Sequence, residues 1–222
     1  MTIISLAVKI FFRELKSGQL LLMFLSLSLA VGIVASITFF TDRLDSSLMF
    51  ESKQFLGGDL KFESSTPLDE SVFPAGDYSY TTIYEFGSVL GSDTNFQLAS
   101  IKSVSSPYPL VGEIEILDSN NKKIIKKNPP TSGKVWLDAR LASLLEVAVG
   151  EVVNIGEKDF SVSGIILSES DRGAGSFAFA PKAIMNSADL EEANVIQPGS
   201  RVRYSYTFLS SIENIKTLET YF

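Results

Sequence analysis

One long uncharged stretch near the N-terminus dominates the pattern of apolar and polar residues in this 222-residue chain. No Asp, Glu, Lys or Arg occurs in residues 17–41, and residues 20–40 are almost wholly apolar. A helix of about 20 apolar residues is long enough to cross the hydrocarbon layer of a bilayer. Residues 19–41 are therefore predicted to form a transmembrane helix. The run is longer than the roughly 7–15 apolar residues of a signal peptide, which favours an uncleaved anchor.

The segment ahead of this span has a helical repeat of its own. Apolar residues fill most of it, and polar residues recur at spacings of three and four, namely at Thr2, Ser5, Lys9, Arg13 and Lys16. This stripe predicts that residues 1–18 form an amphipathic helix in the membrane interface. Its three cations favour the cytoplasmic side by the positive-inside rule, which would place residues 42–222 outside.

Beyond the span the pattern changes to shorter elements. Residues 41–56 lack glycine and proline and stop at Gly57-Gly58, which predicts a helical stalk. The Lys122–Lys127 region, which carries four lysines, is interpreted as a solvated loop. Alternation and turn residues predict strands at 59–64, 78–90, 96–104, 112–117, 152–155, 160–167 and 201–208, and helices at 138–146, 181–190 and 211–221.

This mixture of strands and helices without strict alternation predicts an α+β exterior part. The clearest break in it is Asn128-Pro129-Pro130-Thr131-Ser132-Gly133. We therefore expect a stalk and first subdomain over residues 42–131. A second subdomain, returning to the first, is expected over residues 132–222, ending before another membrane span.

Charge is distributed unevenly along the chain and limits its function. The net charge is -7, but the first 41 residues carry +2, so the remainder carries -9. An acidic exterior part argues against nucleic-acid binding, which needs clustered cations. The chain has no cysteine and no histidine, so thiol chemistry and the usual general base near neutral pH are missing.

No sequence pattern identifies a catalytic, cofactor-binding or metal-binding residue. Neither a phosphate-binding P-loop nor a nucleophile elbow is present, so no ATP hydrolysis is expected from this chain alone. The carboxylate pairs Glu113/Glu115 and Glu169/Asp171 are permissive for acid–base work, but solvated faces are the favoured interpretation. An exterior hydrolase would require Glu169 or Asp171 in a deep cleft with a raised pKa.

The stretch of residues 171–181 has an unusual composition, with two glycines followed by alternating aromatics. Phe177 and Phe179 are expected to point the same way. They could form an apolar contact surface for a hydrophobic substrate or a partner subunit. The favoured alternative makes them core residues and pairs Asp171 with Arg172.

Several short stretches, in this order and spacing, resemble the FtsX/MacB-type ABC-transporter permease family, in its YbbP-like branch. They are Phe40-Thr41-Asp42-Arg43, Leu56-Gly57-Gly58-Asp59-Leu60, Tyr108-Pro109-Leu110-Val111-Gly112-Glu113, Val135-Trp136-Leu137-Asp138-Ala139-Arg140-Leu141, Asp171-Arg172-Gly173, Phe179-Ala180-Pro181 with Met185-Asn186, Ala188-Asp189-Leu190 and Ile196-Gln197-Pro198-Gly199-Ser200-Arg201-Val202. The resemblance spans nearly the whole chain.

The resemblance implies a non-catalytic permease subunit in the bacterial inner membrane, with a MacB-like periplasmic core domain. It also implies a separate ATPase partner, a stiff first span and stalk that couple ATP hydrolysis to exterior movement, and export or extraction of hydrophobic compounds or lipids. A full permease has further spans, so this chain is expected to be an N-terminal fragment. The alternative from a different class is a single-pass, membrane-anchored binding or scaffold protein.

Overall fold

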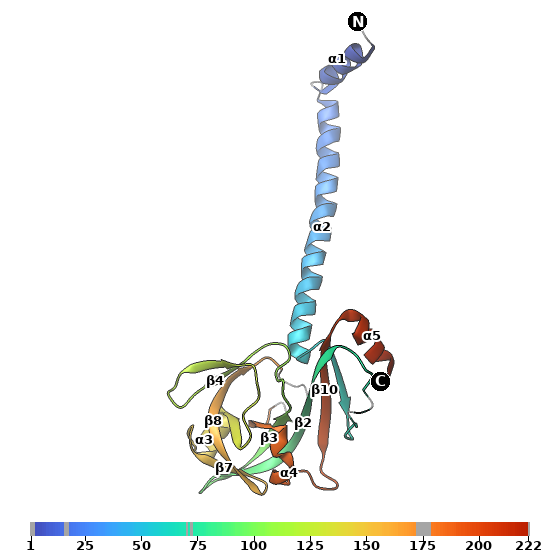
Figure 1. Cartoon of the computed structure of the whole chain (residues 1–222). Helices are drawn as coiled ribbons and strands as arrows, with labels where there is room; N and C mark the ends of the chain where they lie inside the picture. The colour runs from blue at the N-terminus through green and yellow to red at the C-terminus, as the bar shows by residue number, and fades with distance from the viewer. Residues whose placement is uncertain (1–2, 16–17, 70, 72, 172–178, 222) are drawn as a thin grey trace. The chain divides into compact units, whose positions relative to one another are not determined.

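The computed structural model describes all residues of the chain except 1–2, 16–17, 70, 72, 172–178 and 222. It divides the chain into two units, Met1–Phe50 and Glu51–Phe222, and each is considered by itself (Figure 1). The first unit holds helix α1, Ile3–Leu15, and most of helix α2, Gln19–Leu56.

Helix α2 is one uninterrupted helix of 38 residues. Gly18, just before it, has a φ of +83°, a backbone conformation that glycine adopts without steric cost. Among the described residues this is the one helix long and apolar enough to cross a membrane. From Leu21 to Phe50 its apolar side chains are exposed, as a lipid-facing helix requires. The predicted span and stalk are thus parts of one helix.

The second unit is built on one large, mostly antiparallel sheet. Its strand order is β1-β10-β2-β3-β9-β6-β8-β4-β5, and β7 pairs with both β2 and β8. The strands are β1 (Leu60–Ser64), β2 (Tyr78–Gly91), β3 (Phe96–Val104), β4 (Ile114–Leu117), β5 (Lys123–Lys126), β6 (Lys134–Asp138), β7 (Val152–Ile155), β8 (Lys158–Glu169), β9 (Lys182–Asn186) and β10 (Val202–Ser210). The short helices are α3 (Ala139–Leu145), α4 (Leu190–Ala193) and α5 (Ile212–Tyr221), with a 3-10 turn at Ser187–Asp189.

Strand β7 closes part of this sheet into a ring. Because it joins β2 to β8, the strands β2, β3, β9, β6, β8 and β7 form a continuous hydrogen-bonded circuit. Alternate side chains of these strands fill the main core, including Phe86, Ile101, Leu137 and Phe160. Helix α3 adds buried Leu141 and Leu145, and its N-terminus is capped by Asp138, which accepts from the Leu141 N–H at 2.5 Å.

A second, smaller core lies on the opposite face of the same strands. It contains Ile83, Val104, Tyr108, Ile114, Ile116, Trp136 and Ile184. Residues directly opposite on neighbouring strands share a face, and the register places Glu85 beside Lys102 and Arg203 beside Glu85. Lys102, Glu85 and Arg203 therefore lie side by side on the face of the sheet that carries the smaller core.

Most predicted elements are present, and the mixed α/β class is confirmed. The helix expected at 181–190 is wrong, because Lys182–Asn186 is strand β9, with helical turns only after it. The interpretation of the lysine run as a loop is also wrong, since Lys123–Lys126 pairs with β4 as the sheet edge β5. The expected division at residue 131 stays a prediction.

Candidate functional site

The last residues of α2 and the turn after it connect the helix to the sheet. We call this short segment, residues 53–59, the joint. The Gly57 N–H donates to Gln54 O at 3.3 Å and Asp59 N–H donates to Phe208 O at 2.8 Å. The Asp59 carboxylate accepts from the Ser210 N–H at 3.1 Å and pairs with Lys53 of α2 at 2.6 Å. Within the second unit the end of α2 is thus joined by an ion pair to Asp59, which is itself hydrogen-bonded to β10.

Both glycines of this joint are required by space or by backbone conformation. A Cβ on Gly58 would lie 2.6 Å from Thr207 Cγ2 and 2.7 Å from Phe208 O, which is closer than real contacts allow. Gly57 has a φ of +75°, and its Cβ would lie 3.3 Å from Asp171 Oδ2. The joint therefore lies directly against Asp171.

Asp171 belongs to a buried set of charges around Lys102, which is only 1% exposed. Lys102 Nζ donates to Glu169 Oε1 at 2.7 Å, to Asp171 Oδ2 at 3.0 Å and to the Asp171 carbonyl at 3.0 Å. All three donors of the ammonium group are therefore used. A buried charge is tolerated only when it is paired and hydrogen-bonded in this way.

Two further side chains complete what we call the junction cluster, which consists of Lys102, Tyr108, Glu169, Asp171 and Lys182. The Tyr108 hydroxyl donates to Glu169 Oε1 at 3.0 Å, and its ring lies 5.0 Å from Lys102 Nζ. Lys182 Nζ lies 2.8 Å from Glu169 Oε2. Two cations thus balance two carboxylates, so the cluster is neutral as a whole.

The two ammonium groups of the cluster keep the Glu169 carboxylate charged. Burial alone would raise the pKa of Glu169, but the ammonium groups of Lys102 and Lys182 outweigh it and lower the pKa to about 2. Burial would lower the pKa of Lys102, but Glu169 and Asp171 raise it well above its usual value. A carboxyl group that acts as a general acid needs a raised pKa. The cluster is therefore better suited to holding segments of the chain together than to acid–base chemistry.

The structure separates the two predicted carboxylate pairs. Glu113 and Glu115 lie on the surface beside Lys127 at 3.4 Å and Lys123 at 3.7 Å, as expected for a solvated face. For Glu169 and Asp171 that interpretation is wrong, since they are 8% and 2% exposed. The reason is Lys102, which the sequence analysis missed. A lone lysine inside the otherwise uncharged run of residues 96–104 was the available signal.

Three of the stretches that carry the family resemblance contribute residues to the joint and to the junction cluster beside it. They contribute Gly57-Gly58, Tyr108 and Asp171, which are far apart in the sequence. In the segment of residues 171–181, Arg172 and Phe177 lie outside the described residues. Phe179 is 90% exposed, so its interpretation as a core residue is wrong.

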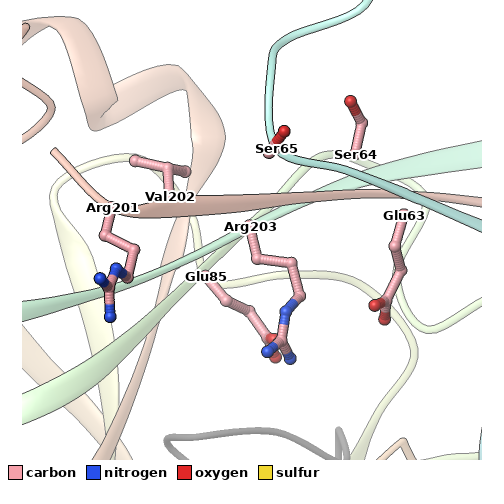
Figure 2. Close-up of a pocket in the computed structure, with 7 residues that line it drawn as sticks. All are labelled: Glu63, Ser64, Ser65, Glu85, Arg201, Val202 and Arg203. Atoms are coloured by element: carbon pink, nitrogen blue, oxygen red, sulfur yellow. The ribbon is translucent and has the colours of Figure 1, made fainter. Parts of the chain in front are cut away.

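A surface pocket of about 280 Å³ lies along the row of charges that starts at Lys102. Figure 2 shows Glu63, Glu85, Arg201 and Arg203 pointing into the same space. Arg203 lies 3.6 Å from Glu85, and Glu63 lies 3.4 Å from Lys61. Its lining charges are two cations and two anions, so they balance in number. Among the described residues no group of acidic side chains is arranged for a metal ion.

The chain belongs to the class of proteins that combine a membrane-length helix with a mixed α/β unit. The sequence is 31% identical over 201 residues to the uncharacterized ABC transporter permease YbbP of Escherichia coli (strain K12). The match covers 89% of this chain and 24% of that protein, so the chain spans about a quarter of the relative's length. This match confirms the predicted resemblance to the permease YbbP.

Two solved structures are similar to part of this chain. The periplasmic region of MacB from Actinobacillus actinomycetemcomitans is 14% identical, with a TM-score of 0.44, and the match covers 66% of this chain and 65% of that one. The extracellular domain of the noncanonic ABC-type transporter YknZ from Gram-positive bacteria is 12% identical, with a TM-score of 0.41, and the match covers 63% and 68%. No protein-family model matches the chain.

Proposed function

We propose that this chain is the N-terminal part of the permease subunit of an ABC transporter, working with a separate ATPase subunit. In this proposal residues 1–18 lie at the cytoplasmic surface, residues 19–41 cross the bacterial inner membrane and residues 42–222 lie in the periplasm. The cargo would be a hydrophobic compound or a lipid. The observation that carries the proposal is the 31% identity to the permease YbbP over most of the chain.

The joint described above supports a mechanical role for α2. At about 1.5 Å per residue its 38 residues extend roughly 57 Å, about twice the hydrocarbon thickness of a bilayer. The end of the helix is fixed by Lys53–Asp59 and by two glycines that leave no free space at Thr207 and Asp171. In this proposal the last turn of α2, which contacts the sheet within the second unit, passes movement on to it.

The first test is the association with an ATPase. The full-length gene product, purified from membranes in mild detergent, is expected to carry the ABC ATPase encoded next to it. A variant lacking residues 1–18 is expected to lose this partner while remaining in the membrane. If the intact protein never retains an ATPase, the single-pass scaffold becomes the better description.

The second test concerns the helix as a transmitter. Ser52→Pro removes a helical hydrogen bond and kinks α2 just before the joint, at a cost of about 3 kcal/mol to the helix. A fluorophore on a cysteine introduced at Asn120, an exposed turn residue, should report ATP-driven changes in the native sequence. We expect that response to disappear in the Ser52→Pro variant and to persist in Ser52→Ala, with the ATPase still bound in both. An unchanged response in Ser52→Pro would remove α2 from the coupling mechanism.

A further inference from the structure

A second, larger pocket lies on the face of the sheet that carries the smaller core. Its volume is about 750 Å³, within the range of small-molecule sites. The walls are strand β5, the loop that follows it and strand β6. The lining residues are Glu113, Ile125, Lys126, Lys127, Asn128, Pro129, Pro130, Thr131, Lys134, Trp136 and Ser163. We call it the basic pocket.

The charges of the basic pocket are unbalanced. Lys126, Lys127 and Lys134 face a single carboxylate, Glu113, which lies 3.4 Å from Lys127. Within the described part of the chain neither Lys126 nor Lys134 has an ion pair. Residues 42–222 together carry a net charge of -9, so this local excess of positive charge is opposite in sign to the charge of the surrounding part of the chain.

The floor of the same pocket is apolar. Trp136 is 3% exposed and belongs to the smaller core, and Pro130 is buried beside it. Ile125 adds an apolar side chain that is 55% exposed. Lys126 lies opposite buried Ile114 on β4, so its half-buried stem extends the apolar wall while its ammonium remains able to reach the opening.

We propose that the basic pocket binds an anionic amphiphile, a molecule with one apolar chain and an acidic head group. The chain would lie against Trp136 and the two prolines, and the head group between Lys126 and Lys134. The charge complementarity selects an anion, and the apolar floor separates this ligand from a simple inorganic ion. The pocket of Figure 2, whose two cations and two anions balance in number, has no such excess of positive charge. Only the role of this ligand as cargo rests on the proposed function.

Protection of a sheet edge explains part of this arrangement. A lysine that points inward from an edge strand discourages pairing with another sheet, and Lys126 on β5 fits that description. Lys134 does not, because β6 is paired on both sides, with β8 and β9. The two lysines border the same opening from different strands. Ligand binding explains this convergence, whereas edge protection would explain Lys126 alone.

The pocket contains its own reporter, since Trp136 is the only tryptophan of the chain. The full 222-residue chain in phosphatidylcholine nanodiscs can be titrated with 12-bromododecanoate, whose bromine quenches a tryptophan on contact. We expect saturable quenching, weaker at high ionic strength because salt screens the head-group contacts. The uncharged 12-bromododecanol should quench much less. Equal quenching by the acid and the alcohol would overturn the anionic part of the proposal.

Variants locate the site. Lys126→Gln with Lys134→Gln should weaken binding of 12-bromododecanoate roughly tenfold, from the loss of two charge contacts. Lys216→Gln, which removes an exposed lysine of α5, should leave binding unchanged and serves as the matched control. The unquenched emission spectrum of Trp136 verifies folding in each variant. Equal affinity in the double variant and the native chain would overturn the assignment.

Two competition experiments define the ligand. Inorganic phosphate at millimolar concentration and an acidic peptide without apolar side chains should not displace the bromo-acid. Displacement by either would show a plain anion site or a protein-binding surface, and would overturn the proposal. None of these measurements needs an ATPase, so a failure here leaves the co-purification test of the proposed function intact.

Discussion

The junction cluster and the basic pocket use the same kind of side chain in opposite ways. In the cluster Lys102 is 1% exposed, and its three donors are all taken by Glu169 and Asp171. In the basic pocket Lys126 and Lys134 border an open space of about 750 Å³ and have one carboxylate nearby. The Lys102 ammonium thus has all its partners within the chain, whereas the two lysines of the basic pocket leave an excess of positive charge at an open space.

The difference separates a structural role for lysine from a binding role. A cation that is buried and fully paired contributes its charge to holding segments together, and its loss leaves the partner carboxylates without compensation. A cation at an open pocket contributes little to folding and much to electrostatic attraction of a ligand. Substitutions in the two regions should therefore affect different measurements.

The largest expected effect is on folding, from Lys102→Met. This change leaves two buried carboxylates beside each other, which should lower the free energy of unfolding by about 3–5 kcal/mol. Because whole domains have only about 5–15 kcal/mol, much of the second unit should unfold more easily. Urea unfolding of the reconstituted chain, followed by Trp136 fluorescence, measures it. Lys216→Met is the control. A loss of unfolding free energy below about 1 kcal/mol in Lys102→Met would contradict a structural role for the junction cluster.

The pH dependence of stability should come next in size. The pKa of Glu169 is about 2 in the folded state, below its ordinary 4.5, so its stabilisation is present above pH 4.5 and is lost as pH falls toward 2. The full contribution is on the order of 3 kcal/mol. In Glu169→Gln the difference in unfolding free energy between pH 7 and pH 3 should shrink, whereas Glu115→Gln, at the surface, should keep the native difference. Equal pH dependence in both variants would show that Glu169 is not held ionised by the cluster.

A smaller effect is expected at the joint itself. Gly58→Ala places a Cβ against Thr207 Cγ2 and Phe208 O, an overpacking that should cost about 1–3 kcal/mol. Gly32→Ala is a suitable control, because no heavy atom lies within 4 Å of its Cβ position. Thermal unfolding of the second unit reports both. If the two variants unfold alike, the joint is looser than its geometry implies.

The smallest effect on stability should come from the basic pocket. The double variant of Lys126 and Lys134 to Gln should unfold within about 0.5 kcal/mol of the native chain, since neither lysine has an ion pair in the described structure. The same variant should bind the bromo-acid roughly tenfold more weakly. A large loss of stability would make these lysines structural, and the contrast with the junction cluster would disappear.

Local pattern predicted most of the sheet because its strands alternate or carry β-branched and aromatic residues between clear turns. The hairpin β2–β3 and the capped helix α3 follow the expected ranges closely. Strand β9 was missed because Pro181 and the alanine and methionine after it also favour a helix. Its position between β3 and β6 makes it a strand. Ala183 and Met185 are buried in the main core on one face of the sheet, and Ile184 is buried in the smaller core on the other.

The sequence alone determined the membrane-length helix, the acidic mixed α/β part beyond it and the resemblance to a permease family, because these depend on composition and on short-range order. The tertiary structure alone decided which charges are buried. Lys102 finds its carboxylate partners 67 and 69 residues further along the chain. Burying an ion is tolerable only when its counter-ion arrives by folding, and no local pattern can report a partner that distant.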